Sequence, residues 1–159
     1  MGFFSEMRAL AADVGAATGL TDLKNSLKTK MQRYLNDDFA EASMALLAWV
    51  TMADGEVDAA EVETVVRFID GDETLSIFDS SDLQARFRKH VKALQEDDMF
   101  GLVNVKKAIS KYKGDAEAAS TLLTVGVYLG GSDGDFDESE QEVIRKAALL
   151  LGEDPEVYL

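Results

Sequence analysis

The chain is predicted to fold as an all-α protein, a single-domain helical bundle of seven to nine helices. Its 159 residues are enough for one domain with a substantial core. Apolar residues recur at steps of three and four along most of the chain, which is the period of a helix face. Nowhere do β-branched or aromatic residues alternate with polar ones for long enough to form a strand. The single Pro leaves long helices uninterrupted.

The first helix is expected before Gly15 and Gly19, because apolar residues recur there at helical spacing, at Phe3, Phe4, Met7 and Leu10. We interpret residues 1–20 as an N-terminal amphipathic extension and residues 21–159 as the helical domain. The extension is expected to pack on this domain or to fray, and peripheral association with a membrane surface is the alternative.

The next helix, at 21–35, combines an apolar stripe with a basic face. Two further helices, at 39–52 and 116–129, are apolar on almost every side, which predicts that they lie at the domain centre. An Asn-Asp-Asp cluster precedes the first of them as a capping signal, and a Lys-Gly-Asp sequence precedes the second. Trp49 is expected to be a core residue.

The remaining helices are expected at 58–69, 82–95, 99–112 and 137–151, with shorter turns at 75–78 and 154–155. Ser80 or Ser81 is expected to cap the helix at 82–95. His90, the single histidine, lies between basic neighbours in the sequence. We therefore expect it at the surface and without a catalytic role.

Two acidic stretches indicate that part of the chain is duplicated. The sequence Asp-Gly-Glu-Val-Asp begins at Asp54 and Asp-Gly-Asp-Phe-Asp begins at Asp133, and a Glu follows each three residues later. The same step of 79 residues matches Trp49 with Tyr128. An apolar helix enters each stretch and another helix leaves it. The sequence therefore predicts an internal pseudo-repeat of helix, acidic loop and helix, with both loops at one end of the bundle.

The carboxylates of these loops have two interpretations. In each loop the last Asp and the Glu three residues later fit a capping box at the start of the exit helix. Capping does not explain the two earlier carboxylates, which repel each other unless a cation neutralises them. Acidic residues at alternate positions can place several oxygens around one hard cation. The candidate metal ligands are Asp54, Glu56, Asp58, Glu61, Asp133, Asp135, Asp137 and Glu140.

An all-oxygen ligand set favours a divalent cation, with Ca²⁺ first and Mg²⁺ or Mn²⁺ as alternatives. The loops are not EF-hands. The twelve-residue calcium loop needs Gly at its sixth position and Glu at its twelfth. Counted from Asp54, these positions hold Ala59 and Val65.

Composition excludes several classes of function. The net charge of −14, from 30 acidic and 16 basic residues, argues against nucleic acid and favours a cation or a basic protein partner. The absence of Cys and the single His exclude disulfides, thiolate sites and clustered-His sites within one chain. No nucleophile–base pair or glycine-rich phosphate loop supports a hydrolase. No apolar run is long enough to span a membrane.

With both acidic motifs in tandem, at 52–58 with Glu61 and at 132–137 with Glu140, the sequence resembles the TerB-like proteins of bacterial tellurite resistance. The resemblance covers about residues 29–156. It implies an all-helical bacterial domain, cytoplasmic or at the inner face of the membrane, whose acidic positions bind metal. It also implies a role in tellurite resistance and stress response together with other tellurite-resistance proteins, and no enzymatic activity.

We therefore expect a non-enzymatic tellurite-resistance protein that binds a divalent metal through its two acidic loops and acts as an adaptor for other proteins of the system. A metal-independent, acidic protein-interaction module is the alternative. The oligomeric state and the identity of the partner are left open by the sequence.

Overall fold

The computed structural model describes residues 2–12, 17–131 and 136–159. These residues form eight α-helices and no strand, which confirms the all-α prediction and the expected number of helices. The elements are, in chain order, α1 (Phe3–Ala12), α2 (Ala17–Met31), the 3-10 helix η2 (Gln32–Tyr34), α3 (Asp37–Thr51), α4 (Ala59–Gly71), α5 (Ser80–Glu96), α6 (Asp98–Ser110), α7 (Ala116–Gly130), α8 (Glu138–Leu151) and the 3-10 helix η3 (Pro155–Val157).

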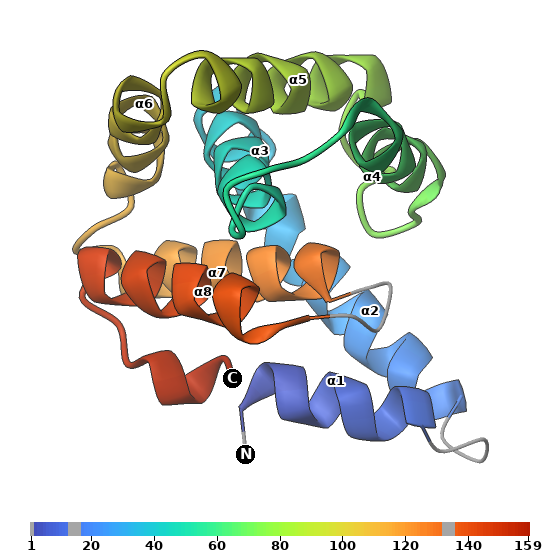
Figure 1. The fold of residues 1–159 in the computed structure, drawn as a ribbon. Coiled ribbons are helices and arrows are strands. Elements are labelled where there is room, and N and C mark those ends of the chain that lie inside the picture. The colour runs from blue at the N-terminus through green and yellow to red at the C-terminus, as the bar shows by residue number, and fades with distance from the viewer. Residues whose placement is uncertain (1, 13–16, 132–135) are drawn as a thin grey trace.

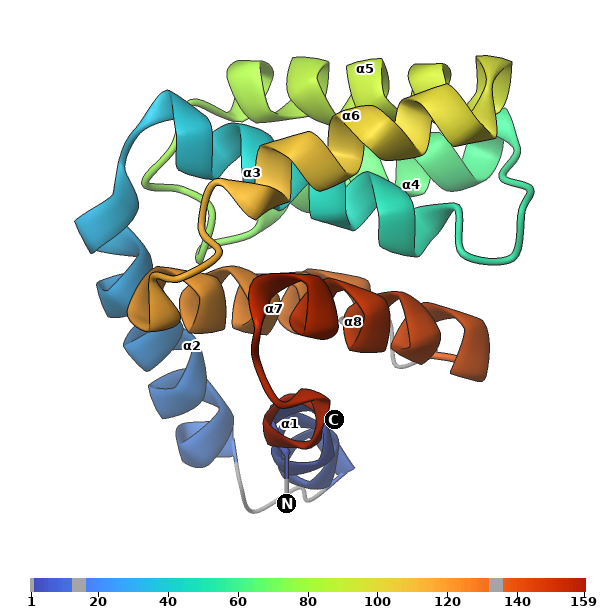
Figure 2. The same cartoon turned by 90° about the vertical axis from the view of Figure 1, so that its left-hand side faces the viewer.

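Helix α3 is the centre of the domain (Figure 1). It packs against α5 and α6 on one side and against α7 and α8 on the other. Seen from the side in Figure 2, α3 to α6 form one group, α7 and α8 lie below it, and α1 lies beyond them. A helix enclosed on all sides must be apolar on all sides, and this explains the composition of α3. Trp49 is buried in the core, as predicted.

The duplicated units have matching helix limits. The step from Asp37 to Ala116, where α3 and α7 begin, is 79 residues, and the step from Ala59 to Glu138, where α4 and α8 begin, is also 79. The exit helices nevertheless pack differently. Helix α8 packs against α7 and α3, whereas α4 packs against α5. The two units therefore agree in where their helices begin but differ in which helices pack against the exit helix.

Short polar side chains begin most of the helices. The side chain of Asn36 accepts a hydrogen bond from the backbone N–H of Phe39 at 2.8 Å, which confirms the predicted cap of α3. The prediction for α5 was wrong. Its cap is Asp79, whose carboxylate accepts from the N–H groups of Ser81 and Asp82, so Ser80 is already the first helical residue. A carboxylate satisfies two N–H groups and also places negative charge at the helix N-terminus.

Helix α1 packs against α2 and α7 through its apolar side. Phe4 and Met7 are buried, and the ring of Phe4 meets that of Phe136 edge to face at 4.8 Å. The two ends of the chain also meet, because the N–H of Phe4 donates to the carbonyl of Tyr158 at 2.9 Å. The apolar residues that a surface-bound helix would insert into a membrane thus belong to the core. The boundary at residue 20 stays a prediction. None of the described helices has the length and apolar character needed to cross a bilayer.

The surface position predicted for His90 was wrong, since only 5% of the residue is exposed. It lies three residues after Phe87 and four before Leu94, both of which are buried on the inner side of α5. Helical period therefore places His90 inward, and its basic neighbours in the sequence say nothing about its own direction. Its Nε2 lies 3.4 Å from Oε2 of Glu41 on α3.

Candidate functional site

The first acidic loop joins α3 to α4 through a tight turn at Gly55. This glycine has a φ of +90°, in the left-handed region that other residues adopt at a cost. Its N–H donates to the carbonyl of Met52 at 2.9 Å. Next to it, Oδ1 of Asp54 accepts from the backbone N–H of Glu56 at 3.2 Å. One Asp54 oxygen is therefore used to hold the loop.

The last Asp of each loop caps the exit helix, as predicted. Oδ1 of Asp58 accepts from the N–H of Glu61 at 2.8 Å at the start of α4. At the start of α8, Oδ1 of Asp137 accepts from the N–H of Glu140 at 2.9 Å. The reciprocal bond, from the N–H of Asp137 to the Glu140 carboxylate, completes a capping box there. The side chains of Asp58, Asp137 and Glu140 therefore have a structural role in addition to any binding role, whereas Glu61 contributes its backbone N–H.

The described parts of the two units meet at a cleft of about 370 Å³. Asp54 and Glu61 of the first unit and Asp137 and Glu140 of the second line it. Its walls also include apolar side chains, among them Leu47, Val50, Val65, Phe68 and Leu129. The fold thus brings four of the eight predicted ligands to one opening. The other predicted residues of the second loop, Asp133 and Asp135, lie outside the described residues.

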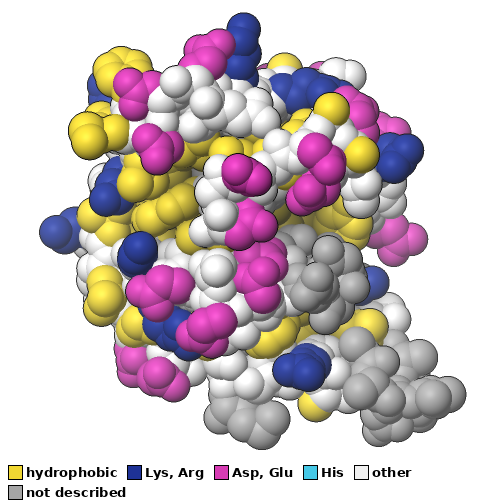
Figure 3. Space-filling model, in the orientation of Figure 1, with side chains coloured by type: hydrophobic (Ala, Val, Ile, Leu, Met, Phe, Trp, Pro, Cys, Tyr) yellow, Lys and Arg dark blue, Asp and Glu magenta, His cyan; other side chains and the backbone are white. Residues whose placement is uncertain are grey.

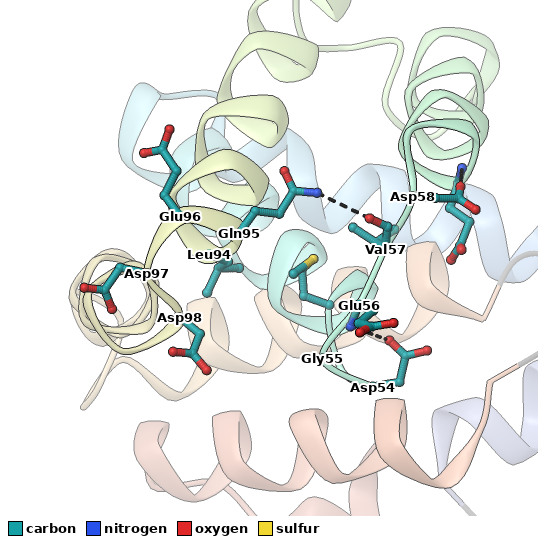
Figure 4. Close-up of a pocket in the computed structure, with 12 residues that line it drawn as sticks. Asp54, Gly55, Glu56, Val57, Asp58, Leu94, Gln95, Glu96, Asp97 and Asp98 are labelled. Atoms are coloured by element: carbon teal, nitrogen blue, oxygen red, sulfur yellow. Dashed lines mark hydrogen bonds between the residues drawn. The ribbon is translucent and has the colours of Figure 1, made fainter.

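A second and larger hollow, of about 820 Å³, extends from the first loop to the corner between α5 and α6 (Figure 4). We call it the acidic groove. Seven carboxylates line it, together with Met52, Val57 and Leu94. The carboxylates belong to Asp54, Glu56, Asp58, Glu61, Glu96, Asp97 and Asp98. A hydrogen bond of 3.4 Å from the Gln95 side chain to the carbonyl of Val57 joins the two walls.

Three of these carboxylates were not predicted as site residues. They form the run Glu96-Asp97-Asp98 between α5 and α6. From the sequence alone, this run reads as the end of one helix and the cap of the next. Asp97 does cap α6, by accepting from the N–H of Phe100 at 3.1 Å. The only signal in the sequence was the charge of the run itself. The run and the first loop are far apart along the chain, so the sequence does not show that they are close in space.

The carboxylates of the acidic groove do not converge on one point. Figure 4 shows Glu96 and Asp97 directed away from Asp54 and Glu56. Across the part of the chain that the structure describes, no three His, Asp or Glu side chains are close enough together to hold a metal ion. The donor chemistry suits a hard cation, but the described residues do not assemble a complete ligand set. The assignment of the eight carboxylates as metal ligands therefore stays a prediction.

A separate charged cluster lies between α3 and α5, around Glu41. Its carboxylate pairs with Lys89 and lies 3.6 Å from the Arg86 guanidinium and 3.4 Å from His90. Burial lowers the pKa of His90, and this effect outweighs the attraction of Glu41. Burial works in the opposite sense on Glu41, but the hydrogen bond from Lys89 and the nearby positive charges outweigh it and lower the pKa of Glu41. This cluster joins two core helices and has no part in the acidic groove.

Comparison with known proteins agrees with the sequence pattern. The family model described as "Tellurite resistance protein TerB" matches residues 40–158, which include both acidic loops. A relative from Alcaligenes sp, named "Tellurium resistance protein TerB", is 29% identical over 108 residues. These residues cover 68% of this chain and 88% of the relative. No solved structure matches the chain.

Proposed function

Because the chain belongs to the TerB family of tellurite resistance proteins, we propose that it acts in tellurite resistance as a non-enzymatic, cation-binding adaptor. The name of its relative from Alcaligenes sp, a tellurium resistance protein, supports the biological role. The finer proposal is that the two acidic loops bind a divalent cation, Ca²⁺ first and Mg²⁺ or Mn²⁺ as alternatives. The partners are other proteins of the same resistance system.

The cleft between the two units is the observation that most supports cation binding. It gathers Asp54 and Glu61 from one unit and Asp137 and Glu140 from the other. A bound divalent cation would supply positive charge that offsets the repulsion between neighbouring carboxylates. The second oxygen of Asp54 is a natural donor in the cleft, because its first oxygen already accepts a backbone N–H group. The proposed remaining ligands are Glu56, Asp58, Asp133 and Asp135.

An indirect role suits this chain better than chemistry on tellurite. Reduction of the oxyanion needs thiols or a redox cofactor, and the sequence has no Cys and no dinucleotide-binding fingerprint. Loops rich in carboxylates also repel an anion. The adaptor role follows from this argument, since a protein that does not transform tellurite must act through other molecules.

Calorimetric titration of chelator-treated protein with Ca²⁺, then Mg²⁺, Mn²⁺ and Zn²⁺, tests the proposal. We expect saturable binding of about one or two equivalents, and its loss in the double variant Asp54→Asn with Asp133→Asn. The matched control is Asp22→Asn with Glu73→Gln, which removes two charges at exposed positions outside the cleft. If no ion gives heat or a thermal shift, cation binding is rejected.

The second candidate function is a metal-independent acidic module that binds a basic protein. The divergent carboxylates of the acidic groove favour it, because a protein partner presents several charges over a wide area. Binding of this kind weakens strongly with salt and does not respond to a chelator. The two functions are therefore distinguished by the effect of a chelator on partner binding.

A further inference from the structure

One side of α6 exposes large apolar residues next to the acidic groove. Met99, Phe100 and Val103 are 78%, 65% and 57% exposed. Their spacing of three and four residues places them together on the outer side of the helix, and we call them the α6 face. Asp98, the residue before them, lines the acidic groove. A group of apolar side chains beside a charged hollow is typical of a protein-binding surface.

The exposed apolar area extends beyond α6. In the orientation of Figure 1, Figure 3 shows hydrophobic side chains on the left-hand side of the molecule, over α6 and in the hollow between α6 and α8. Both acidic and basic side chains border this area. Trp49, Met52 and Ala53 line a further pocket of about 360 Å³ together with residues of α8. Met52 lines both this pocket and the acidic groove, so the two hollows are neighbours.

The acidic groove has little positive charge of its own. Its lining includes no Lys or Arg. Of the seven groove carboxylates, Glu96 has a basic partner among the ion pairs of the described residues. Its carboxylate lies 3.9 Å from the ammonium group of Lys92, which is exposed. Such an exposed pair contributes little stability and is readily exchanged for another cation. The groove therefore offers a set of carboxylates to positive charges from outside.

We propose that the acidic groove and the α6 face together bind a basic amphipathic helix of a partner protein. Apolar residues of that helix pack on Met99 and Val103, while its Lys and Arg side chains reach the carboxylates of the groove. This inference rests on the proposed adaptor role, but it does not require the cation.

The net charge of the chain favours a basic helix over the other candidate ligands of the acidic groove and the α6 face. A net charge of −14 repels a second copy of the chain, an anionic membrane and nucleic acid alike. A basic helix is attracted instead, and its charges are spaced along several turns, as the groove carboxylates are spread over two walls. The apolar α6 face supplies the contact area that a purely electrostatic association lacks.

The test uses a synthetic helical peptide of about 18 residues made of Leu and Lys, with Leu at steps of three and four. Its affinity for the full chain is measured by fluorescence anisotropy, with chelator present and at an ionic strength of about 0.15 M. The peptide control has the same composition in a shuffled order without an apolar face. We expect the shuffled peptide to bind about tenfold more weakly.

Two pairs of protein variants locate the binding site. Met99→Gln with Val103→Gln removes the apolar contacts, and Leu149→Gln, at an exposed apolar position on α8, is its control. Glu96→Gln with Asp98→Asn removes two groove charges that are neither helix caps nor predicted cation ligands. Glu63→Gln with Glu73→Gln is the charge-matched control outside the groove. Each test pair should weaken binding about fivefold or more, and each control less than about twofold.

Equal binding of the two peptides, or equal effects of test and control variants, would overturn the proposal. So would a stable dimer in light scattering that Met99→Gln with Val103→Gln converts to monomer, because a second copy would then cover the α6 face. None of these results depends on the cation. Failure here leaves the calorimetric result standing, and absence of cation binding leaves the peptide result standing.

Discussion

Replacing Gly126 by Ala is expected to destabilise the protein, although Ala is the better helix former. Gly126 lies in α7 where this helix crosses α3. A Cβ at this position would lie 2.5 Å from Cδ2 and 3.1 Å from Cγ of Leu46, and 3.4 Å from Cδ1 of Ile144. Both neighbours are completely buried, so neither can move into solvent. The two core helices therefore approach as closely as they do because residue 126 has no side chain.

Two opposing effects set the magnitude. Ala in place of Gly within a helix stabilises by about 1 kcal/mol. Overpacking a filled core costs about 1–3 kcal/mol, and the short distance to Cγ means that turning the terminal methyl groups of Leu46 does not relieve the clash. We expect a net loss of about 1–2 kcal/mol in the free energy of unfolding. For a chain of this length, that loss lowers Tm by roughly 2–8 °C.

Urea unfolding followed by circular dichroism and by the fluorescence of Trp49 measures this loss. The control is Gly71→Ala at the end of α4, where an added Cβ meets nothing within 4 Å. It should be neutral or stabilising by up to about 1 kcal/mol. Leu46→Val should partly relieve Gly126→Ala, so that the double variant costs less than the sum of the single ones. A stabilised Gly126→Ala variant would refute the close approach of α3 and α7.

Three further predictions concern buried or capping polar groups. Because burial lowers the pKa of His90, the unfolded chain takes up a proton at this residue before the folded chain does as the pH falls, so stability should decrease from about pH 6.5 downward. His90→Gln should make the free energy of unfolding depend less on pH between about pH 7 and 5. An unchanged pH dependence would contradict the lowered pKa of His90. Tyr128→Phe removes the 2.7 Å hydrogen bond from the buried Tyr128 hydroxyl to Asp72 and should cost about 1 kcal/mol in urea unfolding. Asp137→Ala, measured with chelator present, should cost about 1 kcal/mol through loss of the α8 cap, whereas no loss would mean that the cap contributes nothing.

Most of the fold could be predicted because its signals are local. Helical period and capping residues lie within a few positions of the element that they define, and α3 was expected at 39–52 and is observed at Asp37–Thr51. The prediction of Ser80 or Ser81 as the cap of α5, where the structure has Asp79, is an error of the same local kind, because neighbouring residues all have good capping side chains. The duplication indicated that one helix enters each acidic loop and another leaves it, as the structure shows for the described helices. It could not fix how α4 and α8 pack, which depends on different neighbours.

The candidate site was predicted only in part because it is assembled from distant segments. The first loop and the corner between α5 and α6 form one groove, yet Asp54 and Asp98 are far apart in the chain. The periodic patterns of the sequence predict helices, but they do not predict which distant segments lie side by side. His90 shows the opposite case. Its inward direction was present in the spacing from Phe87 and Leu94, and the charges of its sequence neighbours concealed it.

The carboxylates of the cleft and of the acidic groove fall into groups that suit different ligands. An ion needs oxygens that converge, and a protein partner needs charges that are spread. Asp58 and Asp137 hold helix N-termini, so a substitution there mixes the loss of a cap with any loss of binding. Glu96 and Asp98 line the acidic groove without capping a helix, and they report on partner binding alone. Substitutions at these two positions can therefore abolish docking in a chain whose loops still bind a cation, and this separation decides whether the two properties are coupled.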